Sequence, residues 1–152
     1  MKNLYAAGVL WCLLFTAFTS FAQGEPPLNQ QLPEKPFLFS NLPNKFECNQ
    51  EVLQKLFNLS VNQKFTITLA DTFRFEGEMS GKYIRNKYLT SINILLRNYD
   101  GALFNVSRIL ETKGITYTGR ILNTNNGDVL QLIKEKEKYF FVKQERRFVM
   151  VE

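Results

Sequence analysis

Residues 64–79 read KFTITLADTFRFEGEM, and the alternation in this stretch decides the fold class. Apolar residues occupy every second position over 65–69 and again over 73–79, with Gly77 in the same register. A period of two is typical of a strand that rests one face on a core. The Ala-Asp-Thr sequence at 70–72 interrupts the pattern with turn chemistry. The stretch therefore predicts two neighbouring strands joined by a turn.

The same period continues downstream and predicts a series of short strands. Turn residues such as Tyr99-Asp100-Gly101 separate them, and Asn126-Gly127 favours a tight hairpin because both residues tolerate a positive φ. The strands that we expect are 64–70, 73–80, 88–97, 102–110, 115–122, 128–134, 138–143 and 146–151. A meander of about eight antiparallel strands has to hide its edges. We therefore predict a mostly β fold (α+β by count), rolled or closed as a small barrel.

A short helix and a proline-rich arm precede the strands. Residues 49–59 place apolar side chains at helical spacing, and Asn49 can cap the helix. All five prolines fall between residues 26 and 43, where they predict an extended arm over 23–45. Within this arm, Phe37-Leu38-Phe39 is apolar enough to dock on the domain. We expect the helix to pack on the sheet within a single domain over 46–152.

The N-terminus has the pattern of a secretory signal peptide. Lys2 precedes an apolar run over residues 4–18, and small residues stand before a cleavage position after Ala22. The alternative is an uncleaved anchor, but the run is slightly short for a membrane span. We expect a leader over 1–22, export to the periplasm or the cell exterior, and contact with the membrane only through the leader before cleavage.

The composition excludes several kinds of chemistry. The chain contains no histidine, which excludes Ser–His and Cys–His nucleophile pairs and histidine-ligated metal sites. Removal of the leader leaves one cysteine, Cys48, which we expect to be a buried small hydrophobe rather than a nucleophile. We expect no cofactor and no metal. Without Lys2 the net charge is +4, which is too diffuse to predict a nucleic-acid partner.

Glu76 and Glu78 are the weak catalytic candidates. They share one strand face at a separation of roughly 6.5–7 Å, near the spacing used by glycoside hydrolases. This pattern leaves open a histidine-free secreted hydrolase acting on glycans. The competing interpretation is a solvated strand face on which Arg85 or Lys87 pairs with the glutamates.

The C-terminal hairpin is locally basic, but glutamates neutralise half of its charge. Its aromatic residues at 139–141 predict core side chains under a solvated surface rather than a stacking platform.

The leading functional interpretation is a non-catalytic exported binding domain. Its partner is open between an envelope protein, an acidic glycan and a small apolar molecule. If the barrel closes, Phe65, Phe75, Ile94 and Tyr117 are the candidate lining of an apolar ligand site. If the sheet stays open, an edge or the arm is the expected site for strand addition. The oligomeric state is not specified by the sequence.

Overall fold

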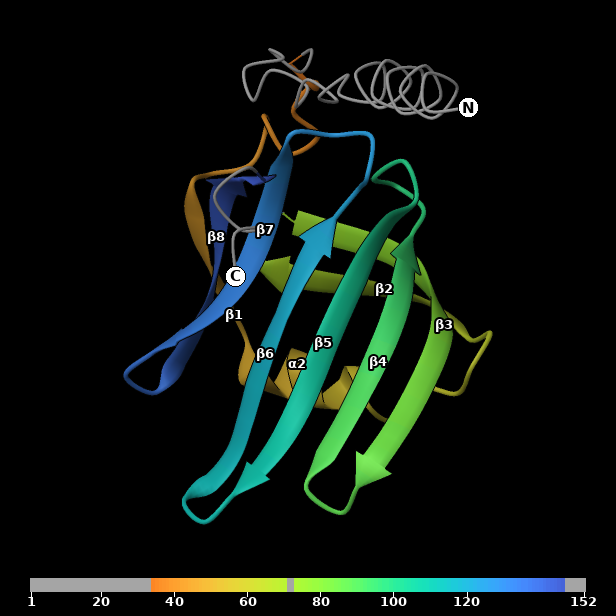
Figure 1. Cartoon of the computed structure of the whole chain (residues 1–152), viewed down its shortest axis with the longest axis vertical. Coiled ribbons are helices and arrows are strands. Elements are labelled where there is room, and N and C mark those ends of the chain that lie inside the picture. The colour runs from red at the N-terminus through yellow and green to blue at the C-terminus, as the bar shows by residue number, and fades with distance from the viewer. Residues whose placement is uncertain (1–33, 71–72, 147–152) are drawn as a thin grey trace, which may run out of the picture. The chain divides into compact units, whose positions relative to one another are not determined.

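The computed structural model describes residues 34–70 and 73–146, which form one antiparallel sheet with a short helix packed on it (Figure 1). The elements are β1 (Lys45–Cys48), α2 (Gln50–Leu56), β2 (Lys64–Ala70), β3 (Phe73–Asn86), β4 (Leu89–Leu96), β5 (Ala102–Glu111), β6 (Gly114–Leu122), β7 (Asp128–Glu135) and β8 (Lys138–Glu145). The strand order is β1-β8-β7-β6-β5-β4-β3-β2, so the strands from β2 to β8 form a meander. The predicted fold, a mostly β meander with one short helix, is confirmed. The predicted leader and the arm up to residue 33 lie outside the described residues.

Strand β1 is present although the sequence did not predict it. It is only four residues long and lies between the arm and the helix, too short for a period of two to stand out. Its residues pair with β8, from Lys45 opposite Val142 to Cys48 opposite Tyr139. The predicted strand over 146–151 falls almost wholly outside the described residues, and β8 ends at Glu145.

The sheet is curled so that its two edge strands approach each other. Strands β1 and β2 contain residues whose Cα atoms lie within 8 Å, and the rings of Phe46 and Phe73 are 4.9 Å apart. Among the described residues, no ladder of backbone hydrogen bonds joins these two edges. The sheet is therefore rolled into a half-barrel and does not close.

Strand β3 is longer than predicted and has an irregular register with β4. It runs to Asn86 rather than ending near residue 80, and its register with β4 shifts between Met79 and Gly81. Such a bulge adds a residue to one strand and bends it. Just before the bulge, a Cβ on Gly77 would lie 2.9 Å from the carbonyl oxygen of Leu95, so the close approach of the two strands requires glycine there.

Helix α2 covers part of the concave face of the sheet (Figure 1). Asn49 caps it as predicted, because its Oδ1 accepts a hydrogen bond of 2.8 Å from the N–H of Glu51. The helix is shorter than the predicted range 49–59. Its buried residues Leu53 and Leu56 join the core, which supplies the packing that a seven-residue helix needs.

The core lies between the helix and the concave face of the sheet. Every second residue of β4 is buried, and the fully buried Phe141 of β8 packs against Phe46 and Phe104 with ring centroids 5.6 Å away. The largest fully buried side chains are Tyr139, Phe39, Phe141, Leu53, Leu56, Met79, Ile92, Ile94, Leu96, Ile121, Leu130 and Val106. The alternation read from the sequence thus separates core positions from outward positions.

Part of the predicted arm is docked on the sheet by the buried carboxylate of Asp128. The carboxylate oxygens accept hydrogen bonds of 2.8 Å from the N–H groups of Leu38 and Phe39. Asp128 is only 2% exposed, and these two donors offset the cost of burying its charge. The predicted docking is confirmed for Leu38 and Phe39, whereas Phe37 is exposed.

The connection between β6 and β7, residues 123–127, is not the predicted tight hairpin. Neither Asn126 nor Gly127 has a positive φ. Instead, the N–H of Gly127 and the side-chain amide of Asn126 both donate to the carbonyl of Pro36, at 3.0 and 3.2 Å. A Cβ on Gly127 would lie 2.8 Å from the carbonyl oxygen of Lys35. Glycine is needed here because the arm passes close by.

Candidate functional site

The candidate catalytic glutamates are each engaged by an arginine. Glu76 pairs with Arg74 at 3.2 Å, and Glu78 pairs with Arg97 of the segment after β4. The prediction that Arg85 or Lys87 supplies these partners is wrong, because β3 continues past the glutamates and carries both bases to its far end. The two carboxylates lie along one strand and do not face each other across a cleft.

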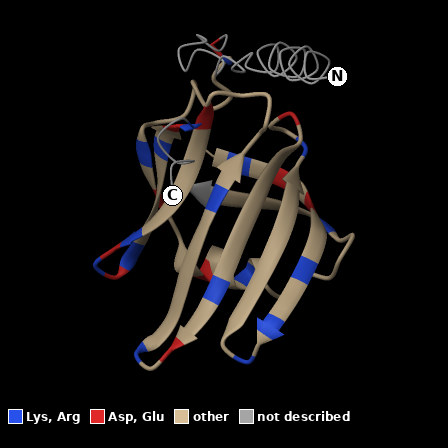
Figure 2. Cartoon of the chain, in the orientation of Figure 1, with Lys and Arg blue, Asp and Glu red and all other residues tan. Residues whose placement is uncertain are grey.

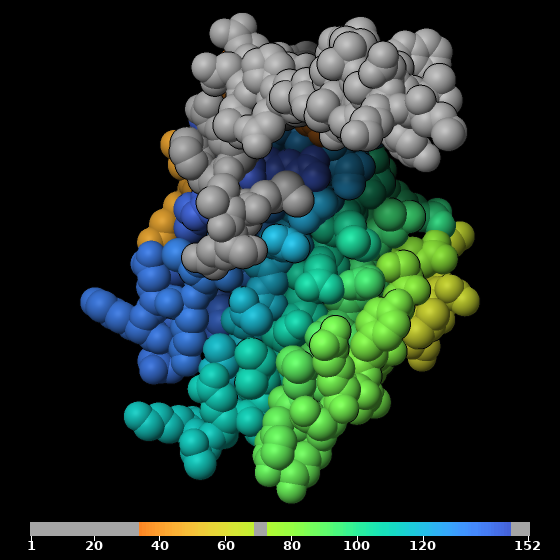
Figure 3. Space-filling model, in the orientation of Figure 1, coloured from red at the N-terminus to blue at the C-terminus, as the bar shows by residue number. Residues whose placement is uncertain are grey.

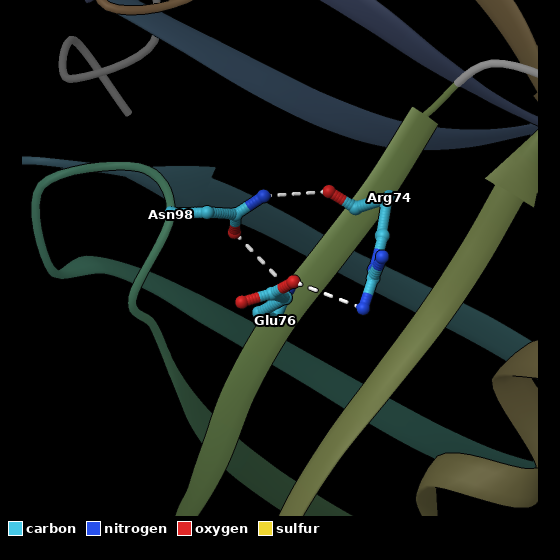
Figure 4. Close-up of polar contacts among 3 residues, drawn as sticks. All are labelled: Arg74, Glu76 and Asn98. Carbon is cyan, nitrogen blue, oxygen red and sulfur yellow. Dashed lines mark hydrogen bonds and ion pairs between the residues drawn. The ribbon is translucent and has the colours of Figure 1, made fainter.

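Asn98 bonds the segment after β4 to this part of β3, a contact that no local sequence pattern predicts. Its Oδ1 accepts a hydrogen bond of 3.0 Å from the N–H of Glu76, and its Nδ2 donates to the carbonyl of Arg74 at 2.6 Å (Figure 4). The N–H of Arg97 also donates to the carbonyl of Glu76 at 2.7 Å. The amide side chain thus continues the β3–β4 ladder beyond Leu96, which is a structural role.

The four predicted lining residues do not surround a common cavity. Phe65 and Phe75 line a hollow of about 10 Å³ together with Leu56, Ile67, Leu96 and Phe104. Ile94 and Tyr117 are buried elsewhere in the core. A hollow of this size is about that of one water molecule, and its apolar walls offer a water no partners. The structure thus shows packed side chains at this place.

Cys48 lies beneath the β1–β8 edge. The side chain is 1% exposed, and burial raises the pKa of its thiol to about 12. A thiol that stays protonated is a poor nucleophile. The prediction of a buried cysteine is confirmed. Among the described residues, no group of three or more Cys, Asp or Glu side chains is placed to hold a metal ion.

The C-terminal hairpin, β7–β8, hides its aromatic rings and pairs its charges. Tyr139 and Phe141 are buried, as predicted. Lys134 pairs with Glu137 at 3.6 Å, and Lys138 pairs with Glu47 of β1 at 2.9 Å. This hairpin therefore offers little free positive charge to a partner.

A different surface is formed where the β3–β4 and β5–β6 hairpins project beyond α2. We call residues 82–89 and 108–116 the hairpin end. The two hairpins lie side by side, because β4 pairs with β5 and the N–H of Leu110 donates to the carbonyl of Tyr88 at 2.8 Å. Asn86 holds the first turn, since its Oδ1 accepts from the N–H groups of Tyr88 and Leu89 at 2.8 and 2.9 Å. The surface is thus built on a hydrogen-bonded framework.

The hairpin end concentrates the positive charge of the chain. It contains one acidic residue, Glu111, and five basic residues: Lys82, Arg85, Lys87, Arg108 and Lys113. Its net charge of +4 compares with +5 for the whole chain. No ion pair within the described ranges involves any of these six residues. Figure 2 shows the ribbon positions of basic residues, in blue, toward the ends of these hairpins at the bottom of the view.

Exposed apolar side chains stand among these bases. Ile84 is 73% exposed, Leu110 48% and Ile115 38%. Tyr83 and Tyr88 are about as exposed as Leu110. These five residues are more than half of the large hydrophobic side chains that the structure describes as exposed. The hairpin ends project at the bottom of the space-filling view (Figure 3).

Helix α2 marks the border of the hairpin end. The Nζ of Lys82 donates to the carbonyl of Phe57 at 2.6 Å, just after the helix. The guanidinium of Arg108 lies over the Phe57 ring, 5.2 Å from its centroid. On the concave face beyond this border, Ile84, Leu110 and Ile115 continue the inward-facing rows of the sheet but are not covered by the helix.

The hairpin end is not predicted by the sequence. Residues 81–87 fall between two predicted strands, and Arg85 or Lys87 is expected to pair with Glu76 and Glu78. Residues 82–89 and 108–116 become neighbours only through the register of β4 on β5, with Leu89 opposite Ile109. The available signal was the combination of Tyr, Ile, Arg and Lys at 82–89 without any acidic residue.

Comparisons with known proteins give no functional lead. No protein family model, curated protein or solved structure matches the chain. In the part of the chain that the structure describes, no helix is long and apolar enough to cross a membrane.

Proposed function

We propose that this protein is a non-catalytic exported binding domain that attaches to an anionic partner through the hairpin end. The observation that carries the proposal is a net charge of +4, without ion pairs in the described structure, around five exposed apolar side chains. Unpaired charge on one surface attracts an opposite charge over roughly one Debye length, about 10 Å at 0.1 M salt.

The rigidity of the hairpin end supports a role in binding. The Leu110–Tyr88 hydrogen bond and the Asn86 turn hold the two hairpins in place before any partner arrives. Lys87 also lies over the ring of Tyr88, 4.8 Å from its centroid. A surface that is already ordered loses less conformational entropy on binding.

A non-catalytic role is supported by the state of the candidate reactive groups. Glu76 and Glu78 are in ion pairs with arginines, and Asn98 uses its amide to extend a ladder. The Cys48 thiol is buried and protonated at neutral pH. No observation favours the glycan hydrolase over a binding domain.

Salt elution from immobilised heparin tests the use of the hairpin end. We expect Arg85→Gln/Lys87→Gln/Lys113→Gln to elute at clearly lower salt than the unaltered chain of residues 23–152. The matched control is Lys55→Gln/Lys64→Gln/Arg120→Gln, which removes three exposed bases that form no ion pair in the described residues. If both triple variants shift equally, retention follows net charge alone and the proposed site is wrong.

Export is tested separately by mass spectrometry on the protein recovered from its host. The leader pattern predicts a mass equal to residues 23–152 in the exported fraction. A mass that includes residues 1–22, recovered with the cells, would contradict export and cleavage.

A further inference from the structure

We infer that the anionic partner is the surface of a lipid bilayer, into which the hairpin end inserts its apolar side chains between anionic headgroups. This inference rests on the proposed function, because it names the partner of the same surface. It differs from the expectation, drawn from the sequence, that only the leader meets the membrane. The sequence does not show that the two hairpins lie side by side.

The aliphatic side chains favour a bilayer over an acidic glycan. Ile84 is the most exposed of the described large hydrophobic residues, and Leu110 and Ile115 are on the adjacent hairpin. A glycan offers hydroxyl and carboxylate groups, which gain little from contact with a branched aliphatic side chain. The acyl boundary of a bilayer removes such side chains from water, which is favourable by about 25 cal/mol per Å².

The tyrosines and bases fit the polar layer of the same bilayer. Tyrosine is enriched at membrane interfaces, where the ring is apolar and the hydroxyl stays hydrated. Tyr88 lies in the first turn and Tyr83 lies near the end of β3, with Arg85 and Lys87 between them in the chain. Long basic side chains can place their charge among headgroups while their stems cover apolar surface.

The charges set the preference for anionic lipid. A base near an anionic membrane surface is worth about 1 kcal/mol, or about a fivefold gain in binding. Stable peripheral attachment to a membrane requires two contributions that act together. Here they are the net charge of +4 and the adjacent cluster of exposed apolar side chains. We therefore expect binding to vesicles that contain phosphatidylglycerol and little binding to phosphatidylcholine alone.

Vesicle co-sedimentation of residues 23–152 tests the role of charge. We expect Arg85→Gln/Lys87→Gln to weaken binding to phosphatidylglycerol-containing vesicles by about 30-fold, from two losses of about fivefold. The control Lys64→Gln/Arg120→Gln removes the same charge elsewhere and should change binding by about twofold or less. Thermal unfolding of each variant shows whether its fold is intact.

A second pair of variants tests insertion. Ile84→Ser/Leu110→Ser should weaken vesicle binding by about tenfold or more while leaving heparin elution unchanged. Leu95→Ser/Leu103→Ser alters two exposed leucines at the opposite end of β4 and β5 and should leave vesicle binding unchanged. Equal effects of the two pairs would overturn the inference.

Tryptophan fluorescence reports directly whether a residue of the hairpin end enters the apolar part of the bilayer. The only tryptophan of the chain is Trp11, so residues 23–152 contain none. A Tyr88→Trp variant should show a blue shift in emission when phosphatidylglycerol-containing vesicles are added. A Leu103→Trp variant should show none. No shift at either position would overturn insertion.

The combined outcomes separate this inference from the proposed function. If heparin elution depends on the hairpin end but vesicles do not bind, the inference is wrong and an acidic glycan or protein becomes the partner. If the Gln variants of the hairpin end match their controls in both assays, the inference and the proposed function are both wrong.

Discussion

The β7–β8 hairpin and the hairpin end both bring basic residues to the tips of strands, but their surroundings differ. In the first, Lys134 and Lys138 pair with glutamates, and Lys143 donates to the carbonyl of Leu42 at 2.6 Å. In the second, the bases stand around Ile84 and Leu110 with no ion pair among the described residues. One hairpin is part of the core structure, and the other leaves its charge and its apolar side chains exposed.

This difference shows that the net charge of a sequence segment does not determine how much unpaired charge the segment presents on the surface of the folded protein. Glu47 reaches Lys138 from β1, which is 91 residues away in the chain. Within residues 34–70 and 73–146, no strand brings an acidic side chain into an ion pair with the hairpin end. The neighbours that a fold supplies therefore decide which basic segment remains available to a partner.

The largest contrast is expected from truncating one apolar side chain in each region. Phe141→Ala in β8 removes a fully buried ring that packs against Phe46 and Phe104. We expect the free energy of unfolding to fall by about 3–5 kcal/mol. Ile84→Ala should change it by about 0.5 kcal/mol or less. Urea denaturation measures both, and similar losses would show that Ile84 is packed in solution.

The next contrast compares an acidic residue in each region. Asp128→Asn, at the start of β7, places an amide NH₂ against one of the N–H donors of Leu38 and Phe39. We expect a loss of about 1–3 kcal/mol in unfolding free energy. Glu111→Gln at the hairpin end should leave stability nearly unchanged. An undiminished stability of Asp128→Asn would show that the arm is not held by this carboxylate.

The pH dependence of stability distinguishes a buried thiol from an exposed one. The buried thiol is that of Cys48, in the strand that pairs with β8. Burial raises the pKa of this thiol from 9.0 to about 12. The unfolded thiol ionises above pH 9 while the folded thiol stays neutral, so its contribution is complete below pH 9 and is lost as the pH rises toward 12. At about pH 10 this loss amounts to about 1.4 kcal/mol.

Denaturation of the unaltered chain and of Cys48→Ala across this alkaline range measures the effect. The unaltered chain should lose stability more steeply than Cys48→Ala. Burial also raises the pKa values of Tyr99 and Tyr117, but both chains share these residues. Adding Thr112→Cys at the hairpin end to Cys48→Ala should not restore the slope, because an exposed thiol ionises alike in both states. If the free energy of unfolding fell equally steeply with pH in all three chains, the burial of Cys48 would be contradicted.

The smallest contrast concerns the ion pairs themselves. Lys138→Gln breaks the exposed pair with Glu47 and should cost about 1 kcal/mol or less, with the difference vanishing at high salt. Arg85→Gln should cost nothing, because no ion pair of Arg85 exists among the described residues. A larger loss for Arg85→Gln than for Lys138→Gln would reverse the comparison.

Much of the fold was predictable because its signals are local. The alternation over 64–79, the Asn49 cap and the turn residues each act within a few positions, and they predicted most strands and the helix. Strand β1 was missed because its pairing with β8 depends on distant residues rather than on its own four-residue pattern. The loop at 123–127 was misread because the arm, not the loop sequence, fixes the conformation of Gly127.

The candidate site was less predictable, because it depends on register. Glu76 and Glu78 could be placed on one face, but their partners Arg74 and Arg97 follow from the length of β3 and the end of β4. The hairpin end combines two segments whose residues meet only across β4 and β5. Exposure of Ile84 depends on where α2 ends over the concave face, which no local pattern specifies.

The pairing of β1 with β8 has a consequence for biosynthesis. Lys45 is bonded opposite Val142, so β1 leaves the ribosome nearly a whole domain before its partner does. Contacts of such sequence separation form late in folding. Until β8 is made, β1 has no strand to pair with, whereas the arm can already bond to Asp128 of β7. We propose that this chain is exported, and this order keeps the nascent polypeptide incompletely folded until its last strands are available. A chain truncated before β8 should leave β1 sensitive to protease.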